Sequence, residues 1–279
     1  MKTIEIKTDK EHTITANVYE AEQSGAVLII SSATGVKQAF YRKFAEFVSA
    51  NGVSVITFDY LGIGLSLKQP IKQLQNDASD WGKVDLEAII KYATEHYPNS
   101  KLTLLGHSIG GQLIGLAKSS SEVQKIILVS AQSGYWKFWK NSGKFKMWVN
   151  WHILFPLLIN TFGYLPSKKV SGMENLPKNV AKQWSKWGRT PNYLFDDISG
   201  QELFFKTISV KILAISIEND AFAPKEAVDW LAYKYENSEI KRVHLMSKDY
   251  ATKEIGHFGI FREKFANDLW KLFLNEVEK

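Results

Sequence analysis

The sequence predicts an α/β fold, in which a mostly parallel sheet carries helices on both faces. Two observations support this: apolar runs of strand length alternate with longer segments of helical period, and most of these runs contain no polar interruption. Parallel strands need crossover connections, which are usually helices, and a sheet covered on both faces needs successive apolar residues. The 279 residues suffice for one large domain or for a core with an insertion.

The expected strands are of two kinds. Residues 4–6 and 13–19 alternate between polar and apolar side chains, which is typical of half-buried edge strands. Short and unbroken apolar runs instead indicate buried strands. These runs cover residues 26–30, 53–58, 102–105, 126–129 and 212–217, and a further strand is expected over residues 240–246.

Helices are expected between these strands. Asp80 is placed to cap a helix that continues to about Tyr97, because a broad apolar stripe follows it and Pro98 ends the pattern. A short helix is expected over residues 112–118, and another begins at Pro224. The last helix is expected over about residues 263–276.

Residues 133–205 interrupt the alternation and are predicted to form a helical cap, inserted into a core of residues 1–132 and 206–279. The cap segment contains six of the nine tryptophans, and its ten Lys and Arg residues against four Asp and Glu equal the net charge of +6. Its uncharged stretch over residues 147–167 is long enough for a membrane span. The Asn, His, Pro and Gly residues in this stretch favour a lid over an apolar pocket instead.

Composition limits the chemistry. Hydrophobic residues make up 45% and charged residues 23% of the chain, as is typical of globular proteins. Cysteine is absent, which excludes disulfides, thiolate metal sites and cysteine nucleophiles. The first 20 residues contain no apolar run of secretory-signal length, so we expect a cytoplasmic protein.

Ser108 is the candidate nucleophile, because it stands at the centre of a GxSxG motif between a predicted strand and a predicted helix. In such a tight turn the positions two before and two after the serine have almost no room for a side chain, which explains Gly106 and Gly110. The hydroxyl then lies exposed at the carboxyl edge of the sheet. The backbone N–H of Ile109 is expected to face a developing oxyanion.

A serine hydroxyl needs a base, and the base needs an acid that orients it. Asp220 lies on the loop after the strand predicted over residues 212–217, whereas the competing Glu218 still belongs to the end of that strand. His257 lies on a later loop between small residues, and the other five histidines lie in or beside predicted elements or in the cap. This order of serine, acid and histidine predicts a catalytic triad.

The second oxyanion donor is expected from the loop after the strand over residues 26–30. We predict the backbone N–H of Ala33 or Thr34, with Gly35 bending the loop. Asp59 is expected to fix a turn rather than to perform chemistry. The sequence has no dinucleotide, P-loop or metal-binding pattern and no nucleic-acid recognition motif, so no cofactor, metal or nucleic-acid partner is predicted.

These motifs resemble those of the α/β-hydrolase family, and more narrowly an uncharacterised bacterial branch near the serine aminopeptidase-like and monoacylglycerol-lipase-like hydrolases. The resemblance spans nearly the whole chain and rests on residues 31–45, 58–66, 106–111, 133–139, 192–197 and 255–261. It implies the α/β-hydrolase fold and the triad roles for Ser108, Asp220 and His257. Many relatives have a His-Gly pair in the oxyanion loop, where this chain has Ala33-Thr34-Gly35.

Two functions follow as hypotheses. The first is a serine hydrolase with an acyl-enzyme intermediate, acting on carboxylic esters that have an apolar part, because the cap is rich in aromatic residues. A peptidase acting on amides is its alternative, and the candidates for binding the amino end of a peptide are Glu174, Asp196, Asp197 and Glu202. The second function is non-catalytic binding of an anionic membrane surface through the basic, aromatic cap.

Overall fold

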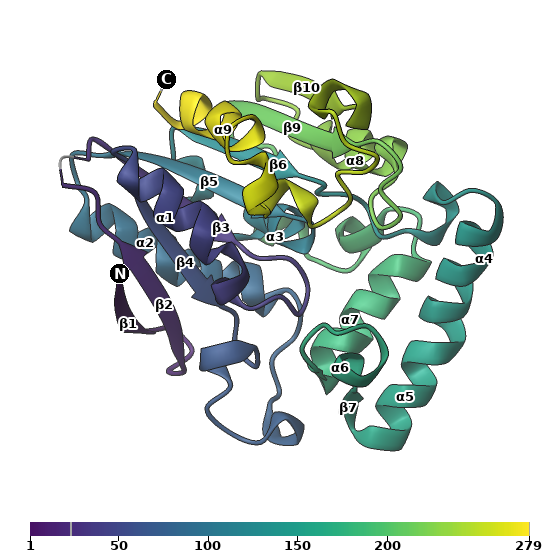
Figure 1. Ribbon diagram of the computed structural model, residues 1–279. Coiled ribbons are helices and arrows are strands. Elements are labelled where there is room, and N and C mark those ends of the chain that lie inside the picture. Colours follow the sequence, from purple (N-terminus) through teal and green to yellow (C-terminus); the bar gives the residue numbers. More distant parts are fainter. Residues whose placement is uncertain (23, 279) are drawn as a thin grey trace.

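A computed structural model describes residues 1–22 and 24–278 of the protein and confirms the α/β fold (Figure 1). The strands of the main sheet are β1 (Lys2–Lys7), β2 (Thr13–Tyr19), β3 (Ala26–Ser31), β4 (Ser54–Asp59), β5 (Lys101–His107), β6 (Lys125–Val129), β9 (Lys211–Ile217) and β10 (Ile240–Leu245). The helices are α1 (Arg42–Ala50), α2 (Glu87–His96), α3 (Ile109–Leu113), α4 (Asn141–Val149), α5 (Phe155–Phe162), α6 (Ser167–Val170), α7 (Lys178–Arg189), α8 (Lys225–Ala232) and α9 (Leu269–Glu278).

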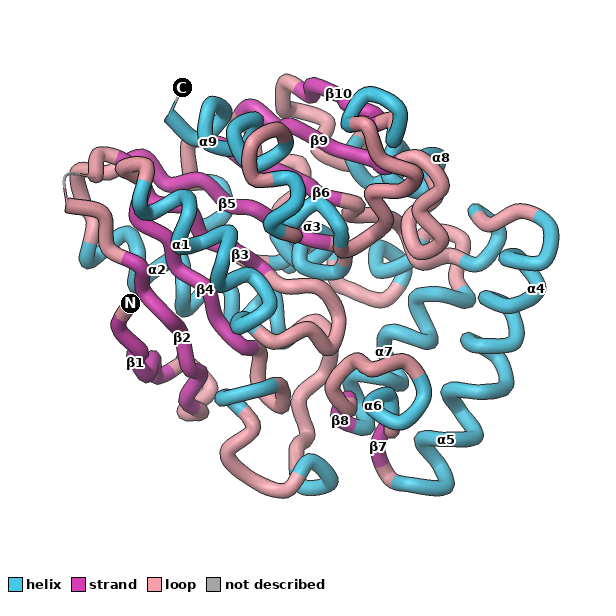
Figure 2. The backbone as a smooth tube through the Cα atoms, in the orientation of Figure 1, coloured by secondary structure: helices cyan, strands magenta, loops and turns pink. Residues whose placement is uncertain are grey.

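The sheet has the strand order β1-β2-β4-β3-β5-β6-β9-β10. From β4 to β10 every neighbouring pair is parallel, whereas β2 is antiparallel to both β1 and β4. The carboxyl ends of the parallel strands therefore meet at one edge of the sheet, and β5 lies near its centre (Figure 2). Loops that follow these strands can place their side chains close together.

Each face of the sheet carries its own apolar core. Helices α1 and α9 cover one face, where Phe44 contacts Trp270 and Phe273 edge-on, with ring centroids 5.5 Å apart in both pairs. Helices α2, α3 and α8 cover the other face, where Trp81 stacks on Tyr60 at 4.8 Å. Strands β3, β4 and β5 are almost entirely buried between these layers, as their unbroken apolar runs predict, whereas the edge strand β10 is partly exposed.

The prediction of an edge strand over residues 13–19 is wrong, because β2 lies between β1 and β4. Its polar residues alternate with apolar ones but are buried and hydrogen-bonded. Thr15 Oγ1 donates to the carbonyl of Leu65 at 3.2 Å, and Asn17 Oδ1 accepts a hydrogen bond from Thr3 Oγ1 at 2.8 Å. Satisfied polar groups in a buried strand produce the same alternation as a solvent-exposed face.

Asp80 occupies the N-cap position of the predicted helix, but its side chain makes no capping hydrogen bond, contrary to prediction. Its carboxylate accepts a hydrogen bond from the backbone N–H of Asp77, on the preceding turn, at 3.0 Å. It accepts a second one from Lys10 Nζ, near the amino terminus, at 2.7 Å. The helix begins as a π-helical stretch, Trp81–Leu86, and continues as α2. Asp59 does fix a turn, because its carboxylate accepts the N–H groups of Gln38 and Leu65 at 2.8 and 2.9 Å.

Two further helices differ from their predicted bounds. The helix expected over residues 112–118 starts earlier, as α3, and ends in a 3-10 turn at Ile114–Leu116. The helix expected over residues 263–276 is a 3-10 turn, Glu263–Phe265, followed by α9.

Between β6 and β9 the chain leaves the sheet and forms α4 to α7, with a small sheet of β7 (Tyr164–Leu165) and β8 (Leu176–Pro177). Helix α4, the π-helical stretch Asn150–Leu154 and α5 follow one another without a break, and α7 packs beside them (Figure 1). Trp184 of α7 contacts Trp151 and Phe155, with ring centroids 4.9 and 5.8 Å apart. Within the described residues, no helix has both the length and the apolar character that crossing a bilayer requires.

Candidate active site

Ser108 lies in the turn that joins β5 at the centre of the sheet to α3. Its backbone has φ 55° and ψ −120°, a conformation that residues other than glycine rarely adopt. Ile109 is the first residue of α3, so its N–H has no acceptor within the helix. The turn therefore presents a hydroxyl and a free backbone donor side by side.

The glycines around Ser108 are required by close backbone contacts. A Cβ atom at Gly106 would lie 2.3 Å from the Cα of Gly111, and one at Gly110 would lie 2.1 Å from the carbonyl oxygen of Ser31. Both distances are far below van der Waals contact. The GxSxG motif predicts this crowding at both positions, and the structure shows which backbone atoms cause it.

Asp220 and His257 come together from loops that follow β9 and β10. His257 Nδ1 lies 2.8 Å from Asp220 Oδ2. Because a carboxylate can only accept, Nδ1 carries a proton, and in the neutral imidazole Nε2 keeps its lone pair. Asp220 is itself held by the N–H groups of Phe222 and Ala223 at 2.8 and 3.0 Å and by Ser130 Oγ at 2.9 Å. These bonds fix the orientation of the imidazole.

Glu218, the competing acid, points elsewhere, because its carboxylate accepts the N–H of Ser247 at 3.0 Å. Ser108 and His257 instead line one cavity of about 390 Å³ between the core and the cap. Neither Ser108 Oγ nor His257 Nε2 has a hydrogen-bond partner among the described residues. Both atoms are therefore free to engage a bound molecule.

The cavity is mainly apolar. Its hydrophobic lining consists of Trp139, Met147, Trp151, Leu154, Phe155, Leu158, Leu165, Met173, Trp184, Phe222 and Phe258, together with Ala33. No carboxylate lines it within the part of the chain that the structure describes, and Lys146 contributes its one Lys or Arg side chain there. This lining can hold an uncharged, apolar group against Ser108.

The cap acids do not face this cavity, so the predicted binding of a peptide amino end by them is wrong. Glu174 lies near Lys37 and Lys168, and Glu202 near Lys83. Asp197 binds Lys186, Gln183 and Trp187, and Asp196 accepts a hydrogen bond from Asn192. Each of the four carboxylates thus has a cation or a hydrogen-bond donor beside it.

The loop after β3 contains the two predicted oxyanion donors. The N–H of Ala33 is not available, because it donates to the hydroxyl of Tyr41 at 3.0 Å. The N–H of Thr34 has no acceptor among the described residues, and Thr34 lines the cavity. Gly35, with φ 63°, turns the chain, and its carbonyl accepts the N–H of Glu174 in the cap at 2.8 Å.

A buried pair, Tyr41 and His107, connects this loop to the loop of His257. His107 Nε2 lies 3.0 Å from the carbonyl oxygen of His257, and His107 Nδ1 lies 2.8 Å from the hydroxyl of Tyr41. Because a carbonyl only accepts, Nε2 donates and Nδ1 accepts from Tyr41. Burial lowers the pKa of His107 well below its ordinary value, and the nearby His257 ring lowers it further. Burial also raises the pKa of Tyr41, so both groups are neutral.

Sequence reasoning does not assign these positioning roles to Tyr41, His107 or Ser130. His107 is visible inside the GxSxG motif, but the motif requires no particular residue there. Tyr41 and Ser130 have no spacing signal, because each contacts a residue that is far away in the sequence. A buried polar residue next to a motif is the one general signal that applies to His107.

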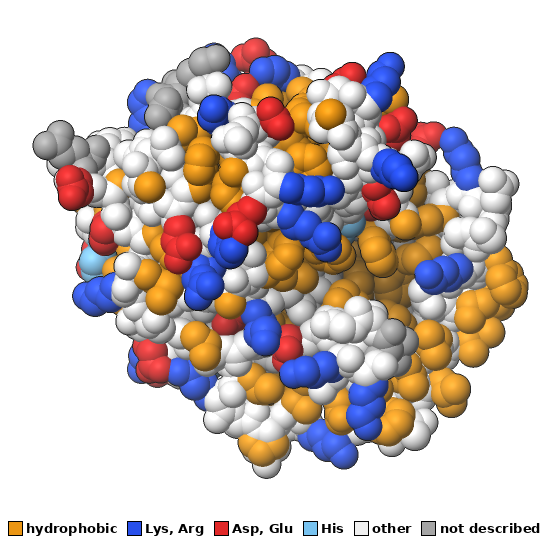
Figure 3. Space-filling model, in the orientation of Figure 1, with side chains coloured by type: hydrophobic (Ala, Val, Ile, Leu, Met, Phe, Trp, Pro, Cys, Tyr) orange, Lys and Arg blue, Asp and Glu red, His pale blue; other side chains and the backbone are white. Residues whose placement is uncertain are grey.

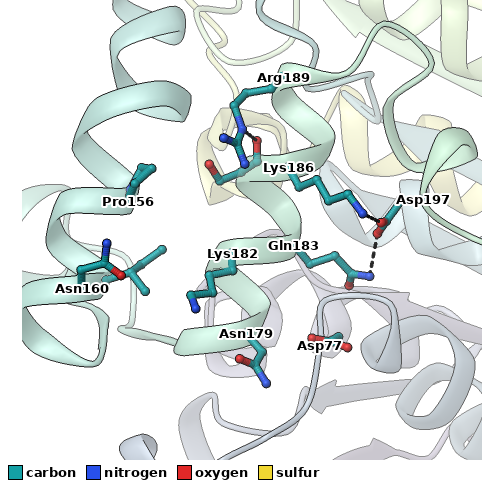
Figure 4. Close-up of a pocket in the computed structure, with 11 residues that line it drawn as sticks. Asp77, Pro156, Asn160, Asn179, Lys182, Gln183, Lys186, Arg189 and Asp197 are labelled. Carbon is teal, nitrogen blue, oxygen red and sulfur yellow. Dashed lines mark hydrogen bonds and ion pairs between the residues drawn. The ribbon is translucent and has the colours of Figure 1, made fainter.

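Other cavities lack these groups. One of about 510 Å³ lies between α5, α7 and Asp77 (Figure 4), and its charged side chains include Lys182, Lys186 and Arg189. There Gln183 Nε2 donates to Asp197 at 2.9 Å, and Lys186 pairs with the same carboxylate. It contains no nucleophile beside a base. Among the described residues, no cluster of His, Asp and Glu could hold a metal ion.

Comparisons with known proteins agree with the geometry. Residues 25–261 match the family described as alpha/beta hydrolase fold. No curated protein matches the chain. An esterase from Exiguobacterium antarcticum is 17% identical with a TM-score of 0.62, and the match covers 99% of both chains. A thermostable carboxyl esterase from Bacillus coagulans, solved with glycerol, is 12% identical with a TM-score of 0.66 over 99% of this chain and 97% of that one. Such low identities establish likeness of fold alone.

The neutral state of His107 makes stability depend on pH. Its folded-state pKa is lowered, so below about pH 6.5 the unfolded chain takes up a proton that the folded protein does not. We expect His107 to lower the free energy of unfolding by up to about 1.4 kcal/mol per pH unit as the pH falls below that value. Urea unfolding of the wild type and of His107→Gln between about pH 7 and about pH 5.5 measures this. Equal pH slopes in the two proteins would contradict it.

Proposed function

This chain belongs to the alpha/beta hydrolase family, and we propose that it is a serine hydrolase acting on carboxylic esters with an apolar part. One observation carries the proposal: Ser108 and His257 line the same apolar cavity, and Asp220 holds the Nδ1–H of His257 at 2.8 Å. A nucleophile, a base and an orienting acid thus lie where an apolar substrate can bind.

In this proposal, Ser108 Oγ attacks the carbonyl carbon of the ester while His257 Nε2 takes the hydroxyl proton. The backbone N–H groups of Ile109 and Thr34 meet the negative charge on the carbonyl oxygen, and Asp220 stabilises the imidazolium. The bond between the carbonyl carbon and the alkoxy oxygen then breaks, and His257 gives its proton to the leaving alcohol. Water, activated by His257, hydrolyses the acyl-enzyme and restores Ser108.

The lining of the cavity favours an ester over a peptide. A peptide substrate with a free amino end needs a carboxylate or a comparable acceptor beside the nucleophile, and none of the described lining residues is acidic. A cavity of about 390 Å³ lies toward the small end of ligand pockets, which span about 300–1,000 Å³. Two of the structural neighbours are esterases, which supports the same choice.

Ser108→Ala is expected to lower kcat for a short p-nitrophenyl ester by at least about 10⁴-fold, because the variant cannot form the acyl-enzyme. A fluorophosphonate probe should label the wild type and leave the variant unlabelled. The unfolding temperature should remain close to that of the wild type, since the hydroxyl has no hydrogen-bond partner among the described residues. Undiminished turnover in the variant would reject Ser108 as the nucleophile. No labelling of the wild type would favour the non-catalytic hypothesis.

Tyr41→Phe tests how the two loops are held. The substitution leaves the ring in place but removes the partner of His107 Nδ1 and of the Ala33 N–H. We expect kcat to fall by about tenfold to hundredfold with little change in KM, because catalytic groups shift while the cavity keeps its shape. Steady-state kinetics measures both constants.

Tyr19→Phe is the matched control, because the hydroxyl of Tyr19 is buried and has no hydrogen-bond partner among the described residues. This variant should keep the wild-type kcat. If Tyr41→Phe and Tyr19→Phe have the same kinetic constants, the proposed role of Tyr41 is wrong.

A further inference from the structure

Helix α4, the stretch Asn150–Leu154 and α5 form one continuous helix of the cap, which presents apolar side chains both to the cavity and to solvent. Its inner face lines the cavity of Ser108 with Met147, Trp151, Leu154, Phe155 and Leu158. Its outer face leaves large apolar side chains in solvent: Phe145 is 69%, Ile153 49%, Leu157 59% and Phe162 39% exposed. Figure 3 shows hydrophobic side chains gathered along the edge of the molecule that α4 and α5 form. We call these four residues the docking face.

The docking face lies in a lysine-rich part of the cap, in which Lys140 pairs with Glu226 and Lys168 with Glu174. No Asp or Glu occurs between Glu122 and Glu174 in the sequence. Within this interval the cap contains six lysines, at positions 137, 140, 144, 146, 168 and 169. Lys137 and Lys144 form no ion pair with a described residue, and the Nζ atom of each lies 5.5 Å from the ring centroid of Trp136. These cations are available to an external anion.

Helix α7 adds cations on the other side of α5. Lys182 and Arg189 lie along the groove between the two helices (Figure 4), and neither has an ion-pair partner among residues 1–22 and 24–278. The exposed apolar stripe is thus bordered by unneutralised cations on two sides. An uncharged or basic partner would leave these charges without compensation.

Two tryptophans lie at the same end as Lys137 and Lys144. Trp136 and Trp148 are half-buried and both contact the His152 ring, with centroids 6.2 and 4.9 Å away. Tryptophan prefers the boundary between lipid headgroups and acyl chains, where its ring is in an apolar layer and its N–H reaches polar groups. An exposed apolar stripe with tryptophans and lysines beside it is typical of helices that lie on anionic bilayers.

A second copy of the chain fits this surface less well. A two-fold interface would bring the same patch of each copy together, and the lysines of one copy would face those of the other. An anionic bilayer instead neutralises the lysines and covers the apolar stripe. The occupant that these observations favour is therefore a membrane surface.

We propose that the docking face binds an anionic bilayer surface, with Phe145, Ile153 and Leu157 entering the headgroup region and Lys137 and Lys144 at lipid phosphates. The other face of the same helix lines the cavity, so docking places the cavity next to the lipid. The proposal concerns binding alone and holds whether or not the protein hydrolyses esters.

The test is co-sedimentation with vesicles of phosphatidylcholine that contain about a third phosphatidylglycerol, at low salt. Wild-type protein should sediment with these vesicles and stay in the supernatant with pure phosphatidylcholine. Leu157→Ser should lower the partition coefficient about tenfold, because it removes apolar area that the bilayer would bury. Lys144→Gln should lower it about fivefold and weaken its dependence on salt.

Leu65→Ser is the matched control. Leu65 is also an exposed leucine, at 55%, but it belongs to the 3-10 helix Gly64–Ser66, outside the cap and the docking face. It should sediment as the wild type does. Wild-type protein that stays in the supernatant with anionic vesicles, or equal sedimentation of Leu157→Ser and Leu65→Ser, would overturn the proposal. So would a lipid-free dimer, detected by light scattering, that Leu157→Ser dissociates, since a second copy would then be the occupant.

Discussion

The site depends on the strained turn at Ser108. A non-glycine residue with positive φ costs about 1–3 kcal/mol, so the surrounding structure must enforce it. Strand β5 does so from the centre of the sheet, with β3 and β6 paired on either side. The same parallel pairing brings the ends of β3, β6, β9 and β10 to one edge, where the loops of Thr34, Ser130, Asp220 and His257 begin. The parallel sheet therefore both enforces the backbone turn at Ser108 and brings the polar groups together.

Around this turn the protein buries polar groups without burying unpaired charge. Tyr41 and His107 are neutral and share one chain of hydrogen bonds from Ala33 to the backbone of His257. Asp220 accepts four hydrogen bonds. This hydrogen-bonded frame holds the groups that would gain and lose protons, and the cap supplies the apolar surroundings in which their electrostatic interactions are strong.

Features that depend on neighbouring residues could be predicted from the sequence, whereas contacts between distant elements could not. The buried strands, the crowding at Gly106 and Gly110, and the order of Ser108, Asp220 and His257 are visible in short segments. The hydrogen bond that commits the N–H of Ala33 to Tyr41 is not, because it joins a loop to a helical turn. The wrong edge position predicted for the strand over residues 13–19 and the wrong binding role predicted for the cap acids have the same explanation. Their polar side chains find partners elsewhere in the fold, and a linear pattern does not contain those partners.

The hydrogen bond from the N–H of Glu174 to the carbonyl of Gly35 links the cap to the residue next to Thr34. A cap that swings outward to admit a bulky molecule either breaks this bond or pulls the loop with it. In both cases the peptide group of Thr34 is no longer held where it lies with the cap in place. The position of the Thr34 peptide group is therefore tied to the position of the cap.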